Sequence, residues 1–153
     1  MNYMFVLNDI DFGNVQLDAE TIADTLLQKG MWLYTPTTPN IHRLHQGDKV
    51  LVYIAGRGRR FFYASFDVNG DIQANKTEPG NETEEILYKY FKLYTPIVNI
   101  EKWEPPVQIA PIKDQISFIT DKKNWGLHFR QATKIIDDKD FDFICRSRQL
   151  QVL

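Results

Sequence analysis

The sequence has one cysteine, Cys145, among 153 residues, so no disulfide can form within the chain. Such scarcity is typical of proteins in reducing compartments and predicts a cytoplasmic, intracellular location. No segment approaches the roughly 20 consecutive apolar residues of a membrane-spanning helix. Polar residues soon follow the short apolar run near the amino end, so we expect neither a membrane association nor a signal peptide.

The sequence also lacks an excess of positive charge. Its net charge is −2 at pH 7 and its pI is about 5.9, whereas general nucleic-acid-binding proteins are usually basic throughout. Any contact with phosphates must therefore come from a local cluster of cations. The length predicts one domain over residues 1–153, and the aromatic content of 13% favours strands.

The apolar pattern predicts a strand-rich chain with few helices. We expect strands over 3–7, 49–55, 61–68 and 88–100, a helix over 18–29 ending at Gly30, a loop over 69–85, an irregular stretch around Pro105 and Pro106, and a closing helix capped by Asp137. Because strands and helices do not alternate regularly, a doubly wound parallel sheet is not expected. The pattern favours an α+β fold, a small and mostly antiparallel β-barrel with a few short helices packed on it.

Motifs for catalysis and cofactor binding are scarce. The chain has no Gly-x-Ser-x-Gly, phosphate-loop or dinucleotide-binding pattern. His42 and His45 have a spacing found in metal sites, but a closed zinc site needs four ligands and no further Cys or His lies near them. The Asp-x-Lys triplets at Asp121 and Asp137 would suit a magnesium-dependent nuclease, but neither falls on a predicted strand. We therefore expect a protein that is not an enzyme, with no catalytic residues, no metal and no cofactor.

Residues 116–130 combine apolar anchors with cations and aromatic rings. The cations are Lys122, Lys123 and Arg130, and the aromatic residues include Trp125 and His128. Aromatic faces stack on bases and cations meet phosphates, so the mixture suits contact with nucleic acid. A core tryptophan flanked by solvated lysines has the same composition. The residues alone leave both interpretations open.

The sequence resembles the EVE domain, a member of the PUA-like superfamily related to YTH domains. The resemblance is carried by the opening strand Asn2 to Asn8, by Gly30-Met31-Trp32, by the Gly-Asp strand over 46–53, and by the tail over 117–130 with the acidic start of the closing helix. It implies a PUA-like β-barrel with an aromatic pocket, into which family members flip a modified, often methylated, base. The implied partner is DNA or RNA carrying a modified base. A restriction or modification protein is a further candidate partner.

The same resemblance implies a set of pocket residues. Trp32 matches the family's tryptophan before the Gly-Asp strand and is the expected stacking wall, and Asn8 matches a polar position that reaches a base edge. Trp125 and His128 match the tail motif. Tyr53, at the end of the central strand, is expected to line the pocket or to pack.

Two departures from the family pattern bear on which base is preferred. Leu33 and Tyr34 follow Trp32 where relatives usually have Gly and a small residue, and Phe12 stands where Trp is common. These substitutions next to the stacking wall predict a reshaped or partly closed pocket.

A basic loop over 56–60 supplies the expected phosphate contacts. The proposed set is Arg57, Arg59 and Arg60, joined by Lys122, Lys123 and Arg130 from the tail. Three guanidinium groups on one short loop repel each other unless an anion lies nearby, which favours phosphate contact. A solvated hairpin tip is the alternative.

A second function remains open from the residues alone. The acidic net charge and the acidic loop over 78–85 favour a small-molecule or protein-interaction module on the same barrel, without nucleic-acid binding.

Overall fold

The computed structural model describes residues 1–56, 58–120 and 132–151. The helices and strands follow the chain as β1 (Asn2–Leu7), β2 (Ile10–Asp11), β3 (Gln16–Leu17), α1 (Ala19–Lys29), β4 (Met31–Tyr34), η1 (Ile41–Arg43), β5 (Lys49–Ile54), β6 (Phe61–Val68), β7 (Gln73–Ala74), α2 (Glu82–Tyr90), β8 (Leu93–Gln108), η2 (Lys113–Gln115), β9 (Thr133–Ile136) and α3 (Asp138–Gln151).

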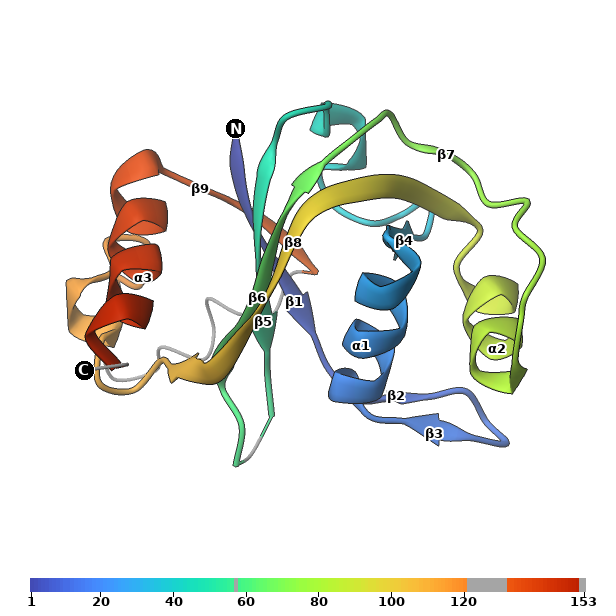
Figure 1. Cartoon of the computed structure of the whole chain (residues 1–153), viewed down its shortest axis with the longest axis horizontal. Coiled ribbons are helices and arrows are strands. Elements are labelled where there is room, and N and C mark those ends of the chain that lie inside the picture. Colours follow the sequence, from blue (N-terminus) through green and yellow to red (C-terminus); the bar gives the residue numbers. More distant parts are fainter. Residues whose placement is uncertain (57, 121–131, 152–153) are drawn as a thin grey trace.

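One mixed sheet organises these elements. Its strand order is β4-β8-β6-β5-β1-β9, and β7 pairs with β8. Among the strand pairs that the structure describes in this sheet, only β1 and β5 run parallel, from Asn2 opposite Lys49 to Leu7 opposite Ile54, and the others are antiparallel. The sheet curls into a half-barrel around α1, while α3 lies on its other side (Figure 1). The expected α+β, PUA-like fold is confirmed.

The long strand β8 supplies much of the curl. Opposite β6, its register jumps from Val107 to Lys102 and again between Glu101 and Val98. Such bulges bend a strand and increase its twist. Pro105 and Pro106 fall inside the first bulge, where a missing N–H costs no ladder hydrogen bond. The stretch expected to be irregular is therefore the bulged end of a strand.

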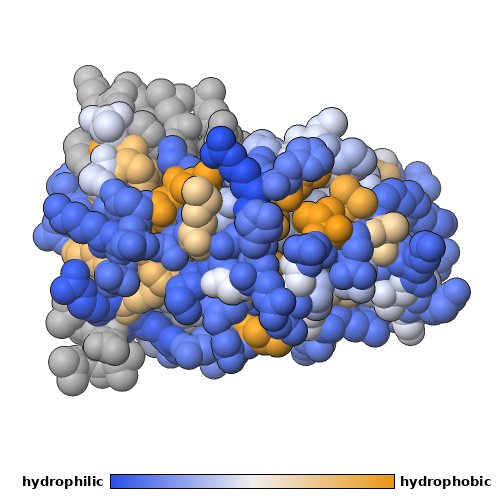
Figure 2. All heavy atoms as spheres, turned by 90° about the horizontal axis from the view of Figure 1, so that it is seen from above, coloured by the Kyte–Doolittle hydropathy of each residue, from blue (hydrophilic) through white to orange (hydrophobic). Residues whose placement is uncertain are grey.

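The sheet separates two apolar cores. Along β1, Tyr3 and Phe5 face one side and Met4 and Val6 face the other, because side chains alternate along a strand. The core on the concave side, here the concave core, contains α1 and β4. The core beneath α3, here the convex core, contains Trp103 and Ile144. The face seen in Figure 2 is covered mostly by hydrophilic residues, with hydrophobic ones in small patches.

Helix α1 has the ends that its sequence predicts. The Asp18 carboxylate accepts a hydrogen bond from the Thr21 N–H at 2.7 Å, and Gly30 ends the helix in the left-handed region with φ of 68°. Its apolar stripe, which includes Ile22 and Leu26, is buried in the concave core. Helix α1 thereby fixes where β4 begins.

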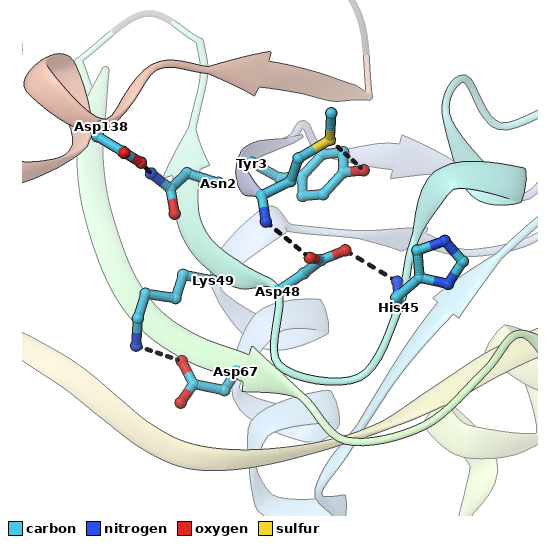
Figure 3. Close-up of polar contacts among 8 residues, drawn as sticks. Asn2, Tyr3, His45, Asp48, Lys49, Asp67 and Asp138 are labelled. Atoms are coloured by element: carbon cyan, nitrogen blue, oxygen red, sulfur yellow. Dashed lines mark hydrogen bonds and ion pairs between the residues drawn. The ribbon is translucent and has the colours of Figure 1, made fainter.

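The turn before β5 is held by a buried carboxylate. Asp48 accepts hydrogen bonds from the Met1 amino group at 2.9 Å and from the His45 N–H at 2.8 Å (Figure 3). The Lys49 N–H donates to the Met1 carbonyl at 3.0 Å. These contacts set where β1 and β5 start beside one another, and so they help to fix the register of the parallel pair.

Helix α2, over Glu82–Tyr90, shows that two predictions were wrong there. These are the loop expected over 69–85 and the strand expected from residue 88. Asn81 caps this helix by accepting from the Glu84 N–H at 2.9 Å, and the Asn81 amide donates to the Glu84 carboxylate at 2.8 Å. The Gly80 N–H also donates to Glu84, at 3.0 Å, and Lys29 pairs with it at 3.0 Å. Glu84 is 4% exposed, so this cluster ties α2 to the end of α1.

No helix within the described ranges has both the length and the apolar character needed to cross a lipid bilayer.

The Glu84 cluster predicts an acid-sensitive contribution to stability. The pKa of this carboxyl is lowered, first by the Gly80 N–H and then by Lys29, against the opposing effect of burial. Because the folded-state pKa lies below the unfolded value of about 4.3, the stabilisation is fully present above that value and is lost as pH falls through the folded-state pKa. Glu84→Gln should lower the free energy of unfolding at pH 7 by about 1–2 kcal/mol. As the pH falls below the unfolded value of about 4.3, the variant should then lose less further stability than the unchanged protein does.

Urea unfolding at a series of pH values measures this effect. Glu85→Gln is the matched control, because Glu85 is exposed on the same helix and pairs only at the surface with Lys89. This control should stay within about 0.5 kcal/mol of the unchanged protein. Equal pH dependence for Glu84→Gln and the unchanged protein would contradict the assignment.

Candidate functional site

A cavity of about 410 Å³ opens at the edge of the concave core and is here called the Trp32 cavity. Its walls come from the end of β1, α1, β4, the loop after β4, the end of α2 and the start of β9. Segments far apart in the sequence therefore meet in one place. Ligand pockets in proteins commonly measure about 300–1,000 Å³, so the size of the cavity suits a small ligand.

Trp32 forms an aromatic wall of this cavity. The side chain is 6% exposed, and its ring lies 6.0 Å from the Phe5 ring and 5.4 Å from the Phe66 ring, centre to centre. Neighbours on β1 and β6 thus hold the indole in place. No hydrogen bond joins the Trp32 indole N–H to another residue in the described part of the chain. The ring is fixed, and its polar edge is uncommitted there.

Asn8 contributes a polar group to the same cavity. It follows the last paired residue of β1, Leu7, and its side chain is exposed. Its amide makes no hydrogen bond to the residues that the structure describes. An amide offers two donor hydrogens and an acceptor oxygen. The structure therefore brings together Asn8 and Trp32, two of the three described residues that the sequence predicted for the base pocket.

A threonine-rich turn after β4 adds hydroxyl groups that sequence reasoning missed. Thr35, Thr37 and Thr38 all line the cavity. The Thr35 N–H donates to Thr38 Oγ1 at 3.0 Å, and Thr35 Oγ1 lies 3.2 Å from the hydroxyl oxygens of Thr37 and Thr38. The Thr133 hydroxyl donates to the Pro39 carbonyl, which ties this turn to β9. The two prolines around these threonines were the available signal for a rigid turn.

Two further aromatic residues reach the cavity from α2 and the residue after it. Tyr90 and Phe91 line it, and their rings lie 4.8 Å apart. Sequence reasoning missed them because it placed this segment in a strand. The capping pattern Asn81-x-x-Glu84 was the signal for a helix.

Tyr53 lies elsewhere. It is buried in the convex core, with its ring 5.2 Å from the Phe62 ring, and it does not line the Trp32 cavity. Burial raises the pKa of its phenol. The reason is the alternation along β5, which sends Val52 to the concave core and Tyr53 to the convex one. Of the two roles expected for Tyr53, the structure places it in packing.

Arg59 is engaged within the protein. Its guanidinium pairs with Asp9 at 2.8 Å and with Glu20 at 2.6 Å. Burial alone would lower the pKa of Arg59, but the hydrogen bonds and charges of Asp9 and Glu20 outweigh it and raise that pKa. The Asp9 carboxylate also accepts from the Ala19 N–H at 2.8 Å. Arg59 therefore braces the β5–β6 hairpin against the start of α1.

The remaining expected site residues divide between exposed and undescribed positions. Arg60 is exposed at the end of the hairpin loop, with φ of 60°. The others lie outside the described residues, namely Arg57, Lys122, Lys123, Trp125, His128 and Arg130.

Features of metal or thiol chemistry are weak in this structure. Within the ranges that the structure covers, no group of three or more His, Cys, Asp or Glu side chains is arranged to hold a metal. Burial raises the pKa of the Cys145 thiol to about 11, so this residue is protonated near neutral pH and suits packing rather than nucleophilic attack.

Comparison with known proteins bears on the fold and the family. A family model for the EVE domain matches residues 21–147. Among solved structures, the human THYN1 protein in complex with DNA containing 5-methylcytosine is 10% identical, with a TM-score of 0.63 and coverage of 97% of each chain. The N-terminal domain of McrB from Staphylothermus marinus is 14% identical, with a TM-score of 0.60 and coverage of 95% of this chain and 93% of that one.

A complex of RNA with the YTH domain-containing protein mmi1 is 10% identical to this chain. Its TM-score is 0.58, and the alignment covers 99% of this chain and 83% of the other. A search of curated proteins found no match. At these identities the structural likeness shows a shared fold, while the family follows from the EVE match over most of the sequence. The chain belongs to the EVE domain family.

Proposed function

We propose that this protein is a non-catalytic nucleic-acid-binding domain that takes a modified base, flipped out of its strand, into the Trp32 cavity. The observation that carries the proposal is that an uncommitted amide, Asn8, and a fixed indole, Trp32, line one cavity of about 410 Å³. The complexes of relatives support it, since one holds DNA with 5-methylcytosine and another holds RNA.

The chemistry of the cavity suits a flipped base. Removing a base from its stack costs a few kcal/mol, and stacking on an aromatic side chain returns about 1–3 kcal/mol per base. Asn8 and the threonine hydroxyls offer donors and acceptors for the polar edge of the base. Apolar walls that include Leu26 and Leu33 reward an added methyl group by about 0.8 kcal/mol, or about fourfold in affinity.

Charge decides which cations are available to contact the phosphates. The net charge is negative, and Arg59 is already neutralised by Asp9 and Glu20. We propose that the phosphate contacts come from Arg60 and from the expected cations outside the described residues, namely Arg57, Lys122, Lys123 and Arg130. Five such contacts, at about 0.7–0.9 each, give a slope of log Kd against log salt of about 3.5–4.5.

A protein-interaction role has one observation in its favour. A groove of about 1,100 Å³ between α3 and the convex face of the sheet is lined by four carboxylates, those of Asp67, Glu101, Asp138 and Asp142, and by two cations, Lys49 and Arg148, which pair with Asp67 and Glu101. Its rim is partly visible in Figure 3, where Asn2 donates to Asp138 at 2.6 Å and Lys49 meets Asp67 at 3.5 Å. With four carboxylates and two cations, the groove keeps a net negative charge, which disfavours phosphates. We propose that a partner protein, such as a restriction or modification protein in the cytoplasm, binds this side.

Binding to oligonucleotides with and without a modified base tests the proposed function. DNA and RNA oligonucleotides carrying methylated or hydroxymethylated bases are compared with unmodified ones by fluorescence anisotropy at moderate salt. We expect a preference for a modified strand, and Trp32→Ala should weaken its binding at least about fivefold, because one stacking contact is worth about 1–3 kcal/mol.

Asn8→Ala keeps this test decisive if Trp32→Ala fails to fold, because Asn8 is exposed. It should reduce the preference for the modified strand several-fold without changing thermal stability. Asn69→Ala, at an exposed asparagine that does not line the cavity, serves as the matched control and should bind normally. Equal binding of modified and unmodified strands by the unchanged protein would refute the proposed function.

The role of Arg59 is tested separately. Because its pairs are only partly shielded from solvent, we expect Arg59→Gln to lower the free energy of unfolding by about 1 kcal/mol and to leave the slope of log Kd against log salt unchanged. A slope reduced by about 0.7–0.9, with stability intact, would show instead that Arg59 contacts a phosphate.

A further inference from the structure

A second, smaller cavity lies beside the Trp32 cavity. It measures about 320 Å³ and lies between the turn joining β2 to β3 and helix α2. Its lining residues are Phe12, Asn14, Val15, Ile86, Lys89 and Tyr90. Tyr90 lines both cavities, so they are neighbours that share one aromatic side chain.

Tyr90 is unusually exposed for a ring that is so well supported. It is 56% exposed, yet the Phe12 ring meets it edge to face at 5.3 Å and the Phe91 ring at 4.8 Å. The Phe12 N–H donates to the Val15 carbonyl at 2.8 Å, which closes the turn that carries Phe12. A ring held from two sides loses little conformational freedom when a ligand stacks on it, so the arrangement suits a preorganised platform.

Lys89 adds a cation to the same cavity. Its side chain is 75% exposed, and its ammonium pairs with Glu85 at 3.4 Å one turn earlier on α2. Such exposed pairs along a helix are worth only a few tenths of a kcal/mol, so Glu85 competes weakly with an incoming phosphate. An aromatic platform next to an available cation is the combination that binds single-stranded nucleic acid.

We infer that the second cavity is a subsite for the nucleotide adjacent to the flipped base. The neighbouring base stacks on Tyr90, and its phosphate meets Lys89. This inference rests on the proposed function, because a base held by Trp32 brings its neighbour to the rim that Tyr90 forms between the two cavities. The protein then recognises a modified base together with the nucleotide beside it.

Single-stranded nonamers test the subsite, with N6-methyladenine or 5-methylcytosine at the centre, as DNA and as RNA. Tyr90→Ala should weaken binding of the preferred nonamer about tenfold, while Tyr90→Trp should retain it. In Tyr90→Ala, binding of the methylated nucleoside monophosphate, followed by NMR, should weaken much less than binding of the nonamer, because only the nonamer has a neighbouring nucleotide to stack on Tyr90. Ile100→Ala, which removes an exposed apolar side chain on β8, is the control and should bind the nonamer normally.

Abasic residues locate the contact. Replacing the nucleotide on one side of the modified base by an abasic residue should weaken binding to the unchanged protein about tenfold. The same replacement should have little further effect on Tyr90→Ala, because the platform is already gone. Lys89→Gln should reduce the salt slope by about 0.7, whereas Lys76→Gln, at another exposed lysine, should leave it unchanged.

The outcomes separate this subsite from the proposed function. If Trp32→Ala weakens binding of both nonamer and mononucleotide while Tyr90→Ala changes neither, the subsite is refuted and the proposed function stands. Equal losses of nonamer and mononucleotide in Tyr90→Ala would also refute it, by placing Tyr90 in the base pocket itself. If the unchanged protein binds no modified nonamer, both proposals fail.

Discussion

The parallel pairing of β1 with β5 is the constraint on which the rest of the structure depends. Both strands are buried on both faces, so the side chains of successive residues pack into opposite cores. A slip of one residue would exchange every side chain between the faces, and Phe5 would leave the back of Trp32. The register is therefore specified by two cores at once. It also decides that Leu7 is the last paired residue and that Asn8 leaves the sheet at the mouth of the cavity.

The cavity forms where regular structure stops. Asn8 follows a strand, the threonine turn follows β4, and Tyr90 ends a helix. Such positions free side chains from the sheet, but each is anchored nearby. Asp48 holds the start of β5, Thr133 ties the threonine turn to β9, and Glu84 ties α2 to α1. The polar groups available to a ligand thus lie on segments that hydrogen bonds and an ion pair within the protein already hold in place. Binding then needs little further ordering of these segments, which favours affinity.

Local signals in the sequence were sufficient for the elements that local physics decides. The capped helix from Asp18, the two strands before and after the basic loop, and the cap at Asp137 follow from residues within a few positions of each other. Helix α2 was missed because Tyr88, Tyr90 and Phe91 are residue types that are common in strands. The end of β8 was missed because its prolines are tolerated in a strand only at a bulge, and this bulge depends on the pairing with β6. Tyr53 and Trp32 lie in different cores because their side chains point to opposite faces of the sheet. The position of Arg59 depends on its contact with Glu20, which is 39 residues away in the sequence. The meeting of Asn8 with Trp32 was expected from family resemblance and not from their own chemistry.

The two-faced sheet also separates two kinds of surface. The concave side holds the aromatic cavities, where few carboxylates compete with phosphate, and the convex side holds the acidic groove beside α3. Because the sheet lies between them, a protein bound along α3 would leave the Trp32 cavity open. The acidic residues are not confined to one face, because Glu20 and Asp24 lie on α1 and three glutamates lie at the start of α2, both on the concave side. The described linings of the Trp32 cavity and of the second cavity nonetheless contain no carboxylate. The charge next to each cavity therefore bears more directly on the proposed nucleic-acid ligand than the net charge of the chain does.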